Sequence, residues 1–155
     1  MSADIRVSII MGSKSDDDHM KPTYELLDKF GVAWEKRVLS AHRQADALAA
    51  YLKEKNNSSV QVFVAAAGLA AALPGVVAAH TIRPVIGVPV PGGALKGMDA
   101  LLSIVQMPGG IPVATVGIGS NGPKNAATLC VHILALADDE LRSKLENYRT
   151  ELSKG

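Results

Sequence analysis

The sequence predicts an α/β fold, a three-layer α/β/α sandwich in which helices cover both faces of a five-stranded parallel sheet. Three observations support this prediction. Five apolar, β-rich runs recur along the 155 residues, helical patterns separate them, and runs such as VSIIM and VQVFVAA are apolar throughout. Alternating strands and helices form parallel sheets through right-handed crossovers, and strands without polar alternation are typical of a sheet covered on both faces.

The five predicted strands are rich in Val and Ile, which favour extended backbone, and Gly or Pro stands near most of their ends. They cover residues 5–11, 32–39, 60–66, 84–90 and 112–118. We expect these strands to form the middle layer of a single domain over residues 1–155, with its core at about 5–136.

Helical patterns occupy the intervals between the strands. Residues 16–30 begin with three Asp, which interact favourably with the positive end of a helix, and Gly31 marks its end. Pro22 either kinks this helix or marks its true first turn. Further helices are predicted over residues 45–55, 70–80 (short and buried) and 95–106, then over 124–137 and, strongly charged, about 138–153.

Composition narrows the classes of function. The formal net charge is +1, so nothing favours a nucleic-acid or acidic-membrane partner. Cys130 is the only cysteine, which excludes an internal disulfide and fits a reducing compartment, and the N-terminus lacks the pattern of a signal peptide. We therefore expect a cytoplasmic protein. Residues 60–82 carry no Asp, Glu, Lys or Arg, but Gly68 and Pro74 interrupt them, which favours a strand and a buried helix over a membrane span.

Charge is distributed unevenly along the chain. Between Val60 and Pro123 the charged residues are Arg83, Lys96 and Asp99. A long stretch with so little charge indicates that its helices contact other subunits as well as their own sheet. The alternative is a monomer with an unusually apolar core.

A ligand site is expected beyond the carboxyl ends of the strands, where open parallel sheets bind their ligands. Reading only those ends gives five loops, which should converge on one edge of the sheet. Their sequences are GSKSD, SAHR, AAGLA, GVPVPGGAL and GIGSNGPKN.

The first of these loops has the features of a phosphate site. Gly12 permits a tight turn, and the amides that follow open a helix, whose N-terminus attracts anions. Ser13 and Ser15 add hydroxyl groups, and Asp16 suits sugar hydroxyls better than phosphate. The same residues also read as an ordinary capping sequence, S-x-x-D, so the two interpretations stay open here.

The second loop combines an anion ligand with an acid/base. Arg43 can bind a phosphate with its guanidinium fork, and Ser40 can add a hydrogen bond. Histidine is the side chain that ordinarily changes charge near neutral pH, so an imidazole at position 42 can both donate and accept a proton. The alternative is a histidine that merely ends a strand. Metal-ligand spacing, a G-x-S-x-G elbow and a full P-loop are all missing from the sequence. The residues alone thus indicate a small phosphate-bearing ligand and a histidine acid/base.

Several motifs in order resemble the N5-carboxyaminoimidazole ribonucleotide mutase family, the bacterial-type catalytic subunit of phosphoribosylaminoimidazole carboxylase. They are IIMGSKSD, SAHR, ALPG, VIGVPV and LLSIVQMPGGIPVATVGIG, followed by KNAA. The resemblance implies a flavodoxin-like doubly wound fold and an isomerase of de novo purine biosynthesis that uses neither metal nor cofactor. It also implies a homo-octamer with sites built at subunit boundaries.

By the same resemblance, the substrate-binding residues are Ser13, Asp16 and Arg43, and His42 is the acid/base. The positions Gly12, Ser15 and Ser40 belong to the same phosphate-facing loops. The AAGLAAALPG loop, with Ala67, Gly68 and Leu73, and the QMPGGIP loop should line the imidazole and carboxylate end. Two departures stand out: Gln44-Ala45 replaces the Thr-Pro of many relatives, and Ala72 replaces a histidine, a change that we expect to tune the pocket.

Such a mutase would most simply release carbon dioxide and recapture it at the ring carbon, which requires confinement beside the ring. Small residues such as Ala66, Ala67, Gly68 and Ala70 would provide a neutral, water-poor pocket. One rival function is direct carboxylation of aminoimidazole ribonucleotide by free carbon dioxide. Another is a non-catalytic flavin-binding module, which the aromatic content of 4% disfavours because a flavin ring needs a stacking partner.

Overall fold

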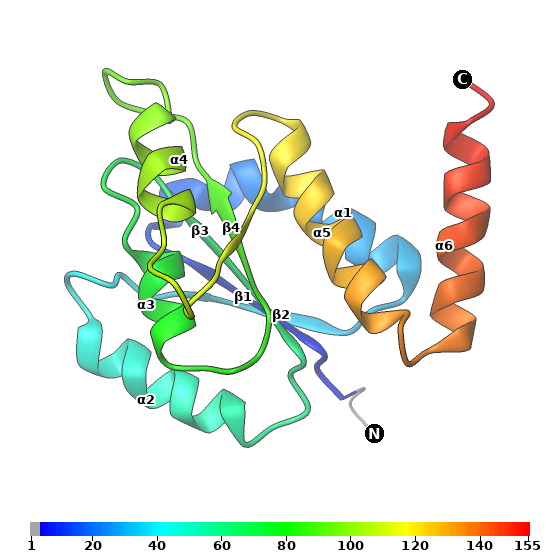
Figure 1. The fold of residues 1–155 in the computed structure, drawn as a ribbon, viewed down its shortest axis with the longest axis horizontal. Coiled ribbons are helices and arrows are strands. Elements are labelled where there is room, and N and C mark those ends of the chain that lie inside the picture. The colour runs from blue at the N-terminus through cyan, green and yellow to red at the C-terminus, as the bar shows by residue number, and fades with distance from the viewer. Residues whose placement is uncertain (1–3) are drawn as a thin grey trace.

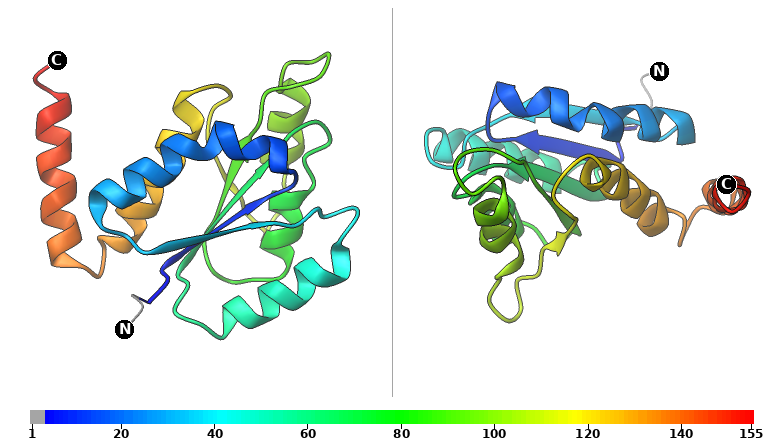
Figure 2. Two further views of the ribbon diagram at one scale, coloured as in Figure 1. Left: turned by 180° about the vertical axis from the view of Figure 1, so that it is seen from behind. Right: turned by 90° about the horizontal axis from the view of Figure 1, so that it is seen from above.

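A computed structural model describes residues 4–155 and shows one sheet between two layers of helices (Figures 1 and 2). All four strand pairings are parallel, and the strand order is β2-β1-β3-β4-β5. This is the doubly wound flavodoxin-like order, so the predicted fold class is confirmed. The strands are β1 Val7–Met11, β2 Trp34–Val38, β3 Val62–Ala67, β4 Val85–Pro89 and β5 Ala114–Thr115.

The fifth strand is much shorter than the prediction of residues 112–118. It pairs with β4 only through Ala114 and Thr115, opposite Ile86 and Gly87. β5 is an edge strand, Pro112 cannot donate a ladder hydrogen bond, and Gly117 lacks a side chain to pack, so pairing does not extend in either direction.

Helices follow every strand. They are α1 Asp17–Phe30, α2 Ala45–Asn56, α3 Leu73–Ala79, α4 Met98–Val105, α5 Asn121–Leu134 and α6 Asp139–Leu152, with a short 3₁₀ helix η1 Lys14–Asp16 before α1. Gly31 ends α1 in the left-handed conformation (φ 72°), as the sequence predicts. Pro22 lies inside α1 rather than in its first turn. α4 begins later than expected because Gly97 (φ 94°) precedes it outside the helical region.

Two apolar cores cover the two faces of the sheet. α1 and α5 pack on one face, and α2, α3 and α4 pack on the other (Figure 1). α4 comes very close to the sheet at Gly87, where an added Cβ would collide with the side chain of Ile104. Among residues 4–155, no helix is both long and apolar enough to span a membrane.

The last helix, α6, stands at one side of the molecule, beside α1 and α5 (Figure 2). An ion pair of 2.6 Å joins Arg6 to Asp138, whose side chain also caps α6 by accepting from the Leu141 amide. Phe30 and Tyr148 meet edge to face at 5.3 Å between ring centroids. These contacts attach α6 to the side of the molecule where α1 and α5 lie.

Candidate functional site

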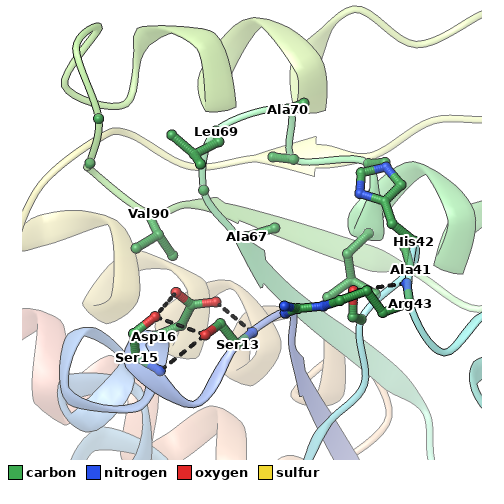
Figure 3. A pocket seen from close by; sticks show the side chains of 18 of the residues that line it. Ser13, Ser15, Asp16, Ala41, His42, Arg43, Ala67, Leu69, Ala70 and Val90 are labelled. Carbon is green, nitrogen blue, oxygen red and sulfur yellow. Dashed lines mark hydrogen bonds between the residues drawn. The ribbon is translucent and has the colours of Figure 1, made fainter.

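A cavity of about 700 Å³ opens at the carboxyl edge of the sheet (Figure 3). Its walls are the loops that follow β1, β2, β3 and β4. β1 lies between β2 and β3, so the chain winds to one side of β1 to form β2 and to the other side to form β3. Parallel sheets bind their ligands at such a switch point. The volume is in the range that small-molecule sites occupy.

Ten of the residues that the sequence and the resemblance single out line this cavity. They are Gly12, Ser13, Ser15, Asp16, Ser40, His42, Arg43, Ala67, Gly68 and Leu73. Further lining residues come from the same loops and from the one after β4: Ala41, Leu69, Ala70, Ala71, Ala72, Val90, Pro91, Gly92 and Gly93. Ala66 is an exception among the residues expected to provide a neutral pocket, because it is fully buried in the core on the α1 side.

The loop after β1 is closed by its own polar groups. The Ser13 hydroxyl accepts hydrogen bonds from the amide and hydroxyl of Ser15, and the Ser13 amide donates to an Asp16 carboxylate oxygen at 3.1 Å. The capping interpretation of S-x-x-D is therefore correct. It does not compete with ligand binding, since Ser13, Ser15 and Asp16 all face the cavity (Figure 3).

Asp16 is buried, with 7% of its surface exposed. Burial raises the pKa of its carboxyl above the ordinary value, against the opposing effect of hydrogen bonds from Ser13 and Ser15. The ionised carboxylate thus costs the folded protein free energy relative to the unfolded chain, and this cost disappears as the pH falls through the raised pKa. In its ionised form this carboxylate can accept hydrogen bonds from ligand hydroxyl groups.

We expect Asp16→Asn to raise the melting temperature at neutral pH or leave it unchanged, because the amide oxygen can still accept the Ser13 N–H bond without a buried charge. The difference from the parent should shrink toward acid pH, where Asp16 itself becomes neutral. Thermal unfolding at both pH values checks this, with Asp18→Asn, at an exposed position in the first turn of α1, as the control. A clear fall in melting temperature at neutral pH would contradict the account.

The loop after β2 is held in shape at both ends. The Ser40 amide donates to the Gln44 side-chain oxygen at 3.1 Å, and the Arg43 amide donates to the Ser40 hydroxyl at 3.2 Å. Gln44 therefore fixes the entrance to α2. From this loop Arg43 extends toward Ser13, and His42 extends toward the side of the cavity where Ala70 lies (Figure 3).

The wall opposite these polar loops carries no ionisable group. It consists of residues 67–73, up to the start of α3, and residues 90–93 after β4. Ala72 precedes α3 on this wall. The cavity is thus divided into a polar side, with hydroxyls, Asp16 and Arg43, and an apolar side. Among residues 4–155, the histidine that lines the cavity is His42.

Two expected loops do not reach the cavity of this chain. The QMPGGIP loop precedes β5 and therefore lies at the other end of that strand, where Met107 approaches Gly75 of α3. The expectation that this loop lines the part of the cavity for the substrate's imidazole is therefore wrong for the loop and cavity of the same chain. The GIGSNGPKN loop does lie at the carboxyl edge but packs beside the loop after β4, with Ile118 near Gly97.

The remaining histidines lie elsewhere. His19 is in the first turn of α1, and His80 follows the end of α3. His132 is exposed on α5. Within residues 4–155, no three His, Cys, Asp or Glu side chains gather in a way that could hold a metal ion.

The lining of the cavity does not favour the flavin-binding alternative. No aromatic side chain lines the cavity within the described residues, and Tyr24 and Trp34 stack on one another outside it, 4.7 Å apart between centroids. A flavin ring would have no stacking partner there.

Comparison with known proteins agrees with this geometry. A family model described as AIR carboxylase matches residues 6–155. The N5-carboxyaminoimidazole ribonucleotide mutase of Saccharolobus solfataricus is 48% identical over 147 residues, which is 95% of this chain and 92% of that protein. The Bacillus subtilis protein of the same name is 51% identical over 143 residues, with 92% and 88% covered.

Among solved structures, that of Treponema denticola PurE superposes with a TM-score of 0.87 at 32% sequence identity, and the match covers 96% of this chain and 91% of that one. The family match spans almost the whole sequence, and the sequence relatives are about half identical. The chain belongs to the AIR carboxylase family.

Proposed function

We propose that this protein, an isomerase by its family and relatives, converts N5-carboxyaminoimidazole ribonucleotide to 4-carboxy-5-aminoimidazole ribonucleotide. This step belongs to de novo purine (IMP) biosynthesis, and we place the protein in the cytoplasm. The observation that carries the proposal is the division of one cavity into a polar, anion-binding side and an apolar side, with His42 between them.

The polar side suits the ribose phosphate. Arg43 offers a guanidinium fork to a phosphate, and the hydroxyls of Ser13, Ser15 and Ser40 add hydrogen bonds. Asp16 can accept hydrogen bonds from ribose hydroxyls. Gly12 lines the cavity beside these groups, and a Cβ added there would be in ordinary van der Waals contact with Ala67 and Asp16, at 3.8 and 3.9 Å. The heterocycle then extends toward the apolar side, along Ala67, Gly68 and Leu73.

The proposed reaction has two parts whose protons balance. First, the bond between the exocyclic nitrogen and the carboxylate carbon breaks, carbon dioxide leaves, and the nitrogen takes up a proton. Second, the ring carbon C4 attacks carbon dioxide, and the new carbon–carbon bond leaves C4 with both a proton and a carboxylate. Removal of that proton restores aromaticity. One proton enters and one leaves, so the net change is an isomerisation.

His42 is the side chain best suited to move these protons. Its imidazole can donate to the departing nitrogen and later accept from C4, a pair of tasks that needs one group able to act in both directions. A guanidinium group has no acceptor site and hydroxyls are poor bases, so neither Arg43 nor the serines can replace it. The apolar wall contributes by keeping carbon dioxide close and water out, which raises its effective concentration at C4.

We also propose that the protein works as a homo-octamer. One face of α4 packs on the sheet, while Met98, Leu102 and Val105 are about half exposed, in the charge-poor part of the chain. Assembly would bury this apolar surface. Sites at subunit boundaries would let the QMPGGIP loop of one copy reach the cavity of another. Light scattering that gives a monomeric mass at micromolar protein would contradict this proposal.

An ultraviolet assay of the N5-carboxy ribonucleotide, with and without the protein, tests the function directly. We expect conversion to the C4-carboxy isomer that depends on the protein. The same assay with aminoimidazole ribonucleotide and bicarbonate tests the rival carboxylase function. Faster turnover of that pair at millimolar bicarbonate than of the N5-carboxy substrate would show that the protein is a direct carboxylase instead.

A further inference from the structure

One apolar residue of the cavity wall has an unusual backbone. Leu69, in the loop between β3 and α3, adopts a left-handed conformation with φ 54°. Leucine rarely adopts this conformation, because its Cβ then crowds the following carbonyl oxygen, whereas glycine adopts it freely. The side chain is also 58% exposed, although it lines the cavity. Neither the backbone nor the core of this chain requires a leucine here.

The Leu69 side chain reaches across to the loop after β4. A Cβ added to Gly93 would lie 2.6 Å from the Leu69 Cδ2, so this methyl group occupies the space that a side chain at position 93 would need. Gly93 itself has φ 61°. The Leu69 methyl group and Gly93 therefore lie against one another where the two loops meet, and both residues line the cavity.

Figure 3 places Leu69 between Val90 and Ala70, with Ala67 below it and the Ser13–Asp16 loop on the other side of the cavity. A ribonucleotide held by its phosphate at the polar loops would thus turn its heterocycle toward Leu69. The exposed part of the leucine side chain would become buried against that ligand.

We propose that Leu69 is a retention residue, an apolar cap that holds released carbon dioxide beside the heterocycle until C4 captures it. This inference rests on the function proposed above. Escape into solvent competes with recapture in any mechanism with a free intermediate, and the outcome depends on how long the gas stays near C4. An apolar side chain that spans two loops narrows the escape route and excludes water without offering a charge that would hydrate the cavity.

The test variant is Leu69→Gly, which removes the cap and leaves a residue that fits φ 54° without strain. The N5-carboxy substrate carries ¹³C in its carboxylate, and the solution contains unlabelled bicarbonate. The readout is the fraction of label in the C4-carboxylate of the product, together with the free aminoimidazole ribonucleotide released, after subtraction of decarboxylation without protein. This fraction reports retention and does not depend on the overall rate.

We expect the parent protein to transfer most of the label and Leu69→Gly to raise the fraction lost to solvent by about tenfold, since confinement supplies the effective concentration at C4. The melting temperature of Leu69→Gly should be unchanged or higher because its backbone strain is relieved. Leu69→Asn should also lose label, since Asn tolerates the left-handed backbone but attracts water.

The matched control is Leu95→Ala, on the same loop as Gly93, exposed to 62% and outside the cavity lining. It should retain label as the parent does. Equal retention by the parent and Leu69→Gly, with both proteins converting substrate, would overturn the retention role while leaving the proposed function intact. Absence of any conversion by the parent would contradict the proposed function itself, and with it this inference.

Discussion

Replacement of His42 by Asn is expected to lower kcat by about 10²–10⁴-fold, the usual contribution of a general acid/base. Asn can form hydrogen bonds of similar reach but cannot titrate near neutral pH, so both proton transfers lose their carrier. The fold should persist, because His42 is exposed on a loop and its ring forms no hydrogen bond to residues 4–155. Steady-state kinetics together with thermal unfolding provide the measurement.

Ligand binding separates this role from a purely structural one. The His42→Asn variant should bind the ribonucleotide with nearly the affinity of the parent, since the proposed phosphate contacts come from Arg43 and the serine hydroxyls. His132→Asn, an exposed position on α5 outside the cavity, is the control and should leave kcat unchanged. A kcat for His42→Asn within tenfold of the parent value would remove His42 from the proton-transfer role.

Arg43→Ala is expected to weaken ribonucleotide binding by about 10–100-fold, because a charge-assisted bidentate contact with phosphate typically contributes about 1.5–3 kcal/mol. The effect should appear mainly in KM, since Arg43 faces the Ser13–Asp16 loop and not the apolar end of the cavity (Figure 3). Arg43→Lys should lie between the parent and Arg43→Ala, because lysine keeps the charge but loses the planar fork. Calorimetric titration and KM measure both effects.

The control for net charge is Arg37→Ala, which removes the same charge from an exposed position on β2 outside the cavity. This variant should have a KM within about twofold of the parent value, because salt largely screens exposed charges that lie far from the cavity. An unchanged KM for Arg43→Ala would show that the guanidinium does not contact the phosphate.

The fold could be predicted because hydrophobic pattern determines most of it. The buried residues of β1 and β3 have no polar alternation, and the helices between the strands have one apolar face, so a covered parallel sheet is the expected result. The length of β5 could not be predicted, since pairing depends on the neighbouring strand. Residues 112–118 look extended in isolation, but only Ala114 and Thr115 find partners.

The site could be predicted in part for a similar reason. Gly12, Ser40 and Arg43 follow the carboxyl ends of strands, and parallel strands bring those ends together whatever the loop conformation. Side-chain direction is harder. Ala66 and Ala67 are adjacent in β3, yet successive residues of a strand point to opposite faces, so Ala66 enters the core on the α1 side while Ala67 lines the cavity.

The roles of Leu69 and Gly93 could not be predicted, because they depend on loop backbone. The sequence places both residues after strands, but the left-handed conformation of Leu69 and its contact with Gly93 arise only when the two loops meet in space. The same limit applies to the QMPGGIP loop. Its motif resembles a site loop, but its position before β5 keeps it away from the cavity of its own chain.

The central claim is that the His42 imidazole moves the proton at the ring carbon that receives the carboxylate. A crystal structure of the protein soaked with the ribonucleotide measures the distance from the nearer His42 ring nitrogen to C4 and to the exocyclic nitrogen. The account predicts about 3–3.5 Å, or a single bridging water, in occupied sites. An imidazole turned away from the heterocycle and separated by more than one water in every copy would contradict it.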